Sequence, residues 1–117
     1  MPVRLWTSSV LKWPDAPTVL EALRQWAETV QRPDVVGIGY CGSYSRGDWG
    51  VGSDLDVVIL VEKATASPER RAAEWDLTEL PVPVDVLVYT PEEWENLPHR
   101  FREETVWLYR RCNYSAI

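Results

Sequence analysis

The stretch from Gly42 to Asp56 constrains this chain more than any other feature. It reads GSYSRGDWGVGSDLD and lies between two apolar segments. Residues two apart in an extended strand share a face, so Asp54 and Asp56 should lie side by side, with Cα atoms about 6.6 Å apart. Two carboxylates this close repel each other, and half-burying them is costly unless a cation lies between them. The following VVILV contains no Lys or Arg. The pattern therefore predicts a divalent metal site.

The apolar segments on either side of this stretch are predicted to be buried strands. They cover residues 35–41 (VVGIGYC) and 54–61 (DLDVVILV). The glycine-rich loop between them has room for one helical turn. A crossover between parallel strands usually needs a dozen or more residues and a full helix, so we expect these two strands to be antiparallel. That relation places Gly42 and Asp54 at the same end of the sheet.

A third strand is predicted at residues 84–89 (VDVLVY). The connection that leads to it contains the start of a helix at Ser67-Pro68-Glu69, which we expect to continue to about Leu77. A helical connection favours parallel strands, so the second and third strands should run in the same direction. Asp85 would then lie near the two aspartates of the second strand. Three carboxylates therefore converge in the predicted topology.

Helices are predicted for most of the remaining chain. Apolar residues recur at helical spacing over residues 16–32, and a capped helix start follows at Thr90. Residues 1–14 are expected to be an arm or irregular strand. A final helix is predicted from the spacing of Phe101, Thr105, Leu108 and Cys112. The whole chain, residues 1–117, is thus expected to be a single α+β domain, with a small mixed sheet of at least three strands covered by helices.

Composition restricts the classes of function. A chain of 117 residues can build one core, with little left for a separate substrate-binding module. Its formal net charge of -6 disfavours a broad phosphate-neutralising surface, so nucleic acid is not an expected partner. Cys41 and Cys112 lack paired spacing, which predicts reduced thiols and a cytosolic (cytoplasmic) protein. The sequence contains no signal peptide and no long apolar span, so no membrane role is expected.

Other nucleotide and hydrolase motifs fit the sequence poorly. The glycines of residues 37–42 form a GxGxxG pattern, but further glycines within residues 47–52 would break the helix that a dinucleotide-binding fold requires there. Lysine is absent from residues 13–62, which excludes a P-loop. His99 is the sole histidine, and no GxSxG elbow or zinc ligand set accompanies it. We expect His99 to be a solvated helix residue.

Phosphoryl or nucleotidyl transfer is the chemistry that remains. Neighbouring carboxylates can hold two metal ions, which neutralise a triphosphate, and carboxylate oxygens suit Mg²⁺ or Mn²⁺. Backbone N–H groups around Gly42 and Ser43 would form an anion-binding nest, with the Ser43 hydroxyl as a further donor. Arg46 is either a phosphate contact or a solvated loop cation.

The order of these residues resembles the DNA polymerase beta-type nucleotidyltransferase superfamily. The resemblance consists of Gly42-Ser43, ten intervening residues, Asp54-Leu55-Asp56, and then Asp85 on a later strand. The short chain resembles the minimal nucleotidyltransferases of that superfamily, and Ser45-Arg46-Gly47 agrees with their motif. Tyr44 and Trp49 depart from the usual pattern and leave the base preference open.

The resemblance implies Mg²⁺-dependent (or Mn²⁺-dependent) transfer of a nucleoside monophosphate from a nucleoside triphosphate, with ATP as the expected donor. Asp54, Asp56 and Asp85 would bind the metal and carry the catalysis. Gly42 and Ser43, with Arg46, would hold the triphosphate. The acceptor would be a hydroxyl on a small helical HEPN-type partner in a toxin–antitoxin pair. Two alternatives stay open: an inactive nucleotidyltransferase-fold module that only docks on such a partner, and, less favoured, an antibiotic-modifying nucleotidyltransferase.

Overall fold

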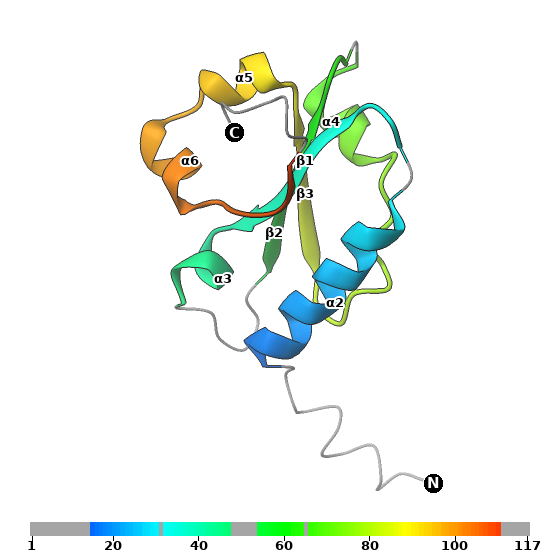
Figure 1. The fold of residues 1–117 in the computed structure, drawn as a ribbon, viewed down its shortest axis with the longest axis vertical. Coiled ribbons are helices and arrows are strands. Elements are labelled where there is room, and N and C mark those ends of the chain that lie inside the picture. The colour runs from blue at the N-terminus through cyan, green and yellow to red at the C-terminus, as the bar shows by residue number, and fades with distance from the viewer. Residues whose placement is uncertain (1–14, 31, 48–53, 65, 111–117) are drawn as a thin grey trace, which may run out of the picture.

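The computed structural model describes residues 15–30, 32–47, 54–64 and 66–110 (Figure 1). Within these residues the elements follow in the order α2 (Ala16–Thr29), β1 (Val35–Cys41), α3 (Ser43–Arg46), β2 (Leu55–Val61), α4 (Pro68–Ala72), β3 (Val84–Tyr89), α5 (Pro91–Glu95), α6 (His99–Glu104) and β4 (Val106–Arg110). The predicted α+β class with a mixed sheet is confirmed. The N-terminal arm predicted at 1–14 lies outside the described residues. No helix in the described part of the chain is long and apolar enough to cross a membrane.

The sheet has the strand order β3-β2-β1-β4. β1 is antiparallel to both β2 and β4, and β2 is parallel to β3. Both predicted strand relations are therefore confirmed. The register pairs Asp56 of β2 with Cys41 of β1 on one side and with Asp85 of β3 on the other.

Helix α2 covers one face of the sheet (Figure 1). It begins because the Asp15 carboxylate accepts a hydrogen bond from the Thr18 N–H at 2.9 Å, which satisfies a donor that the first turn leaves unpaired. Its buried positions Val19, Leu23 and Trp26 recur at helical spacing and pack on the apolar side of β2. Burying each of these side chains contributes about 1.5–3 kcal/mol. The helix ends at Thr29, three residues before the predicted end at 32.

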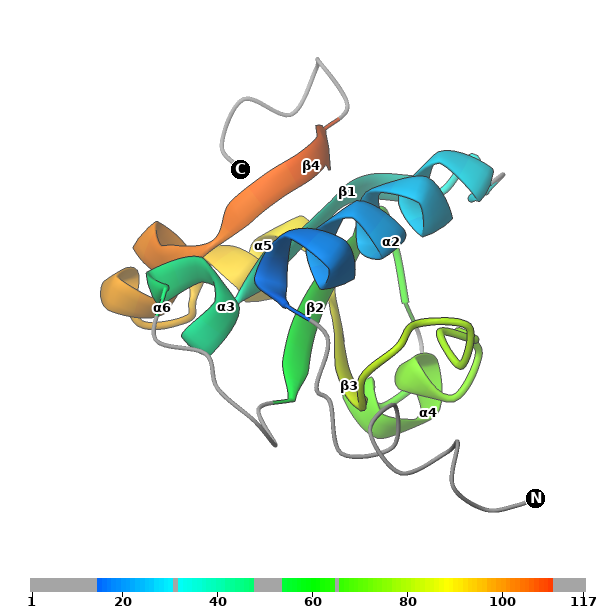
Figure 2. The same cartoon turned by 90° about the horizontal axis from the view of Figure 1, so that it is seen from below.

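The opposite face of the sheet is covered by α5 and α6 (Figure 2). Trp94 of α5 is 2 % exposed and packs among Val36, Val58 and Leu60 of the strands. Its ring also meets the Phe101 ring of α6 in an edge contact, with a centroid distance of 5.8 Å. Asp56 and Asp85 lie on this face as well, because even-numbered residues of β2 and odd-numbered residues of β3 share it.

The prediction of a long final helix is wrong. The helix ends at Glu104, and residues Val106–Arg110 form β4 instead. A strand at this position pairs with the outer edge of β1, which would otherwise expose a row of unpaired backbone groups. The residues Val, Trp and Tyr of this segment also favour a strand. A Cβ on Gly39 would lie 2.6 Å from the Val106 carbonyl oxygen, so this glycine permits the close approach of β4. Phe101 and Leu108, whose spacing suggested a single helix, belong to α6 and to the strand that follows it.

The predicted helix after Ser67 also ends early, at Ala72 rather than near Leu77. The Asp76 carboxylate accepts hydrogen bonds from both the Thr78 N–H and its hydroxyl, and this local turn competes with helix continuation. Trp75, expected inside that helix, lies beyond it and packs edge-on against Trp26 at 6.0 Å. The chain after α4 therefore returns to the core as an irregular segment.

Arg71 of α4 is buried, although charged helix residues usually face solvent. Its side chain is 9 % exposed and forms an ion pair with Glu93 of α5 at 2.6 Å. The same guanidinium donates to the carbonyl oxygens of Ala66 at 2.8 Å and Val88 at 3.2 Å. Arg71 therefore links α4, the end of β3 and the start of α5.

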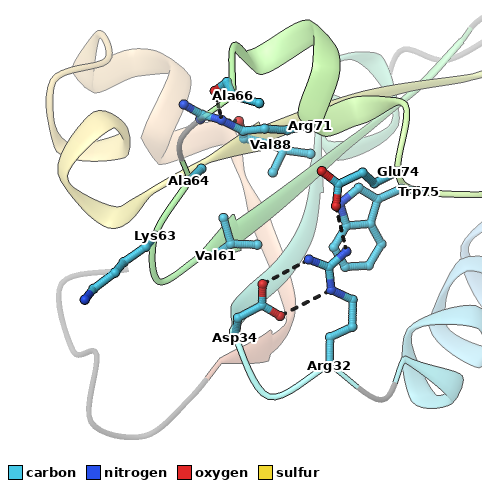
Figure 3. Close-up of a pocket in the computed structure, with 10 residues that line it drawn as sticks. All are labelled: Arg32, Asp34, Val61, Lys63, Ala64, Ala66, Arg71, Glu74, Trp75 and Val88. Atoms are coloured by element: carbon cyan, nitrogen blue, oxygen red, sulfur yellow. Dashed lines mark hydrogen bonds and ion pairs between the residues drawn. The ribbon is translucent and has the colours of Figure 1, made fainter.

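A cavity of about 230 Å³ is lined by Arg71 and by Val61 and Val88 near the ends of β2 and β3 (Figure 3). The guanidinium of Arg32 lies 4.5 Å from the centre of the Trp75 ring. It pairs with Asp34 at 2.9 Å and with Glu74 at 3.6 Å. The Arg32 charge therefore has two carboxylate partners within the protein, and no ligand is needed to account for it.

Candidate active site

The predicted aspartates meet at one end of the sheet. Asp56 is the second residue of β2 and Asp85 the second of β3, and the two are paired in the parallel register. The Leu55 N–H donates to the Pro83 carbonyl oxygen at 2.9 Å, which fixes this register where the strands begin. Asp54 directly precedes β2. The structure thus places the three predicted residues at the same end of the sheet, which we call the acid end.

Burial and charge distinguish Asp56 from the other two acids. Its side chain is half-buried, whereas Asp54 and Asp85 are exposed. Burial raises the pKa of the Asp56 carboxyl, and the negative charges of Asp85 and Asp54 raise it further, against an opposing effect of Arg46. The repulsion expected from the sequence is therefore present at the acid end. A cation placed among these carboxylates would relieve it.

Gly42 lies directly against the Asp56 carboxylate. Its φ of 78° falls in a region that L-residues with a side chain rarely adopt. A Cβ at this position would lie 2.2 Å from Asp56 Oδ2, which is far inside contact distance. The antiparallel pairing of β1 with β2 thus seats the start of the glycine loop on the central acid.

The chain after Gly42 forms one short helical turn, as predicted. The N–H groups of Ser45 and Arg46 both donate to the Gly42 carbonyl oxygen at 3.1 Å. The turn ends at Gly47, whose φ of 83° is left-handed. Ser43 is the first residue of this turn, beside Gly42, where a helix leaves its initial N–H groups without intrahelical partners. The predicted residues Gly42 and Ser43 therefore flank the acid end.

Arg46 lies on the same turn and pairs with an acid from a distant element. Its guanidinium contacts Glu104, the last residue of α6, at 2.8 Å. The positive charge of Arg46 also reaches Asp56, where it opposes the rise in pKa that burial and the neighbouring acids cause. Sequence reasoning missed Glu104, because it lay inside a segment predicted as continuous helix and no motif marks it.

Cys41 is also a close neighbour of the acid end. The thiol is buried, and burial together with the negative charges of Asp56 and Glu104 raises its pKa to about 12. It therefore stays protonated at neutral pH, which excludes it as a thiolate nucleophile. Cys112, which was also predicted to be a reduced thiol, lies outside the described residues.

The acid end fits a metal that is bound together with a substrate. Across the residues the structure describes, no three His, Cys, Asp or Glu side chains are close enough to form a ready-made metal cage. Mg²⁺ usually binds through one or two carboxylates plus substrate phosphates, and Asp56 with Asp85 supplies such a pair. Burial, and after it the charges of Asp85 and Asp54, raise the pKa of Asp56, and a divalent cation beside the carboxylate would offset these effects.

The chain belongs to the nucleotidyltransferase domain family. The sequence profile of that family matches residues 22–108, which include β1, β2, β3, the first residues of β4 and the acid end. None of the curated protein sequences compared with the chain is similar to it. The predicted membership in a nucleotidyltransferase family is confirmed by the profile.

Two solved structures share the fold. One is a Sulfolobus solfataricus protein assigned as a nucleotidyltransferase, with a TM-score of 0.55, 16% sequence identity, and coverage of 94% of this chain and 91% of that one. The other is a toxin-antitoxin structure with AMP-PNP, with a TM-score of 0.50, 17% identity, and coverage of 86% of this chain and 77% of that one. At these identities the likeness concerns the fold.

Proposed function

We propose that this protein transfers a nucleoside monophosphate, AMP from ATP, to an acceptor hydroxyl in a reaction that requires Mg²⁺. One observation carries the proposal: Asp56 contacts the glycine at the start of the loop and is paired in register with Asp85. A phosphate held by the loop would therefore lie beside two carboxylates. Family membership supports nucleotidyl transfer as the general activity.

Each part of the acid end has a role in this proposal. The backbone N–H groups around Gly42 and Ser43, the Ser43 hydroxyl and the Arg46 guanidinium would bind the triphosphate. Asp54, Asp56 and Asp85 would hold the divalent metal, which when bound stabilises negative charge and lowers the pKa of the acceptor hydroxyl. The acceptor oxygen would form a bond to the α-phosphorus as the bond to the bridging oxygen breaks. Pyrophosphate leaves, and the hydroxyl proton passes to solvent.

The acceptor is proposed to be a hydroxyl on a small helical partner protein of the HEPN type. The toxin-antitoxin structure with AMP-PNP supports both an adenine nucleotide and a protein partner, although its likeness to this chain concerns the fold. A cytosolic location belongs to the same proposal, in keeping with the free thiol of Cys41. A module that docks without catalysis, or transfer to an antibiotic, would give different products in the experiment below.

The test is incubation with labelled ATP and Mg²⁺, with and without the protein encoded next to this one, followed by intact-mass measurement. We expect a mass gain of one AMP on the partner, no gain in EDTA, and a loss of at least about 100-fold in rate for Asp56→Asn. Glu79→Gln, an exposed acid in a turn, serves as the control and should keep full activity. Nucleotide binding without any transfer would favour the docking module, and labelling of a free small molecule would overturn the protein acceptor.

A further inference from the structure

The ion pair between Arg46 and Glu104 joins two segments that are 58 residues apart in the sequence. Figure 2 shows α3 and α6 side by side beyond the ends of β1 and β2, in agreement with their 2.8 Å contact. The Glu104 side chain is 23% exposed and that of Arg46 is 48% exposed. The carboxylate is thus the better buried partner, and the guanidinium is the one that solvent or a ligand can reach.

Glu104 is held in place by the core. It ends α6, where the Thr105 hydroxyl donates to the Phe101 carbonyl oxygen at 3.3 Å. The Phe101 ring packs against Trp94, which is the most deeply buried aromatic residue of that face. Arg46, by contrast, lies on a turn of four residues that ends at a left-handed glycine. The fixed partner of the pair is therefore the acid.

Both charges act on the acid end. Arg46 lies on the turn that begins at Gly42, which lies against the Asp56 carboxylate, and Glu104 contacts the Arg46 guanidinium at 2.8 Å. Glu104 is therefore close enough to influence a ligand bound beside Asp56.

We propose that Glu104 is a positioning residue, which holds the Arg46 guanidinium in one orientation so that it is ready to contact the triphosphate. This inference rests on the proposed function. A free arginine side chain loses considerable rotamer freedom when it binds a ligand. A partner that orders it in advance removes part of that cost and so increases affinity.

Removing Glu104 would also change ATP affinity in a second way, opposite in sign to the loss of positioning. The loss of a negative charge strengthens the attraction of the acid end for phosphate, and salt screens this attraction over about 8 Å at physiological ionic strength. Measurements at high salt suppress the long-range charge effect and leave the effect of positioning. The two contributions can therefore be separated.

The experiment measures ATP binding with Mg²⁺ by calorimetry, at roughly 0.15 M and 0.5 M salt. At the higher salt we expect Glu104→Ala to weaken binding by about threefold to tenfold, with a smaller effect for Glu104→Gln, whose amide oxygen still accepts a hydrogen bond. Glu103→Gln is the matched control: it removes the same charge one residue away, where the carboxylate pairs with His99. It should bind ATP as the wild type does.

The decisive comparison repeats Glu104→Ala in an Arg46→Gln background, where the proposal expects no further loss. Thermal unfolding confirms that each variant is folded, and Glu104→Gln provides the comparison if the alanine variant is not. Unchanged or tighter ATP binding by Glu104→Ala at high salt would overturn the inference alone. So would a loss of affinity in the Arg46→Gln background equal to the loss in the wild-type background. Absence of ATP binding by the wild type would instead overturn the proposed function, and this inference with it.

Discussion

At the scale of single residues, Gly42 and Gly47 have similar backbone conformations but differ in what a side chain would contact. Both have a positive φ, at 78° and 83°. A Cβ on Gly42 would overlap the Asp56 carboxylate, whereas a Cβ on Gly47 meets nothing within 4 Å. The first glycine is therefore required by the site as well as by the turn, and the second by the turn alone.

Gly42→Ala should lower stability and displace Asp56. The strained backbone and the contact with Oδ2 together should cost about 1–3 kcal/mol of unfolding free energy, measured by chemical denaturation. ATP binding should be lost as well, because the carboxylate has to move. Gly47→Ala should show only the backbone cost of about 1 kcal/mol and retain ATP binding. Normal ATP binding by Gly42→Ala would contradict the proposed contact between the loop and the acid.

At the scale of elements, the start of α5 is fixed by a small polar network. Thr90 and Glu93 form a capping box, in which each side chain bonds the backbone N–H of the other. The Glu93 carboxylate also pairs with Arg71 of α4. The hydrogen bond from Arg71, with a further contribution from the Thr90 N–H, lowers the pKa of Glu93 to about 2. Two helices that are separate in sequence are thereby attached to the end of β3.

Glu93→Gln should destabilise the domain at neutral pH, and this effect should vanish in acid. Because the pKa of Glu93 is depressed in the folded state, its contribution is present above its ordinary pKa of about 4.3 and is lost as the pH falls toward about 2. We expect a loss of about 1–3 kcal/mol at pH 7. Denaturation curves of wild type and variant should therefore converge between pH 4.3 and 2. A difference that is constant with pH would show that the ionised carboxylate is not responsible.

At the scale of the whole molecule, a ligand that binds only the folded state stabilises the entire domain. With free ATP at about 100 times its Kd, the expected gain is about 2.7 kcal/mol. For a domain of this size that corresponds to a rise in Tm of roughly 10 °C. The shift should require Mg²⁺, because without it the carboxylates of the acid end repel the triphosphate. The wild type with ATP in EDTA should show no such shift in Tm. Asp85→Asn should show none with ATP and Mg²⁺ present.

The sequence by itself determined the parts of the site that depend on local spacing. Alternation along a strand predicts that Asp54 and Asp56 share a face. The length of the connections predicts that β1 and β2 are antiparallel and that β2 and β3 are parallel, as the structure has them. These rules involve neighbours in the chain, so the meeting of Asp56 with Asp85 could be predicted. The roles of these acids and of Gly42, Ser43 and Arg46 stay predictions until the experiments above are done.

Only the tertiary structure decided the features that depend on distant partners. Residues Val106–Arg110 became a strand because the free edge of β1 needed hydrogen-bond partners, a demand that helical spacing within the segment does not reveal. Arg71 became buried because Glu93 and the Val88 carbonyl oxygen satisfy its guanidinium. Glu104 contacts Arg46 because the fold brings the end of α6 beside α3. The energy of each arrangement comes from groups far apart in the sequence, and folding brings them together.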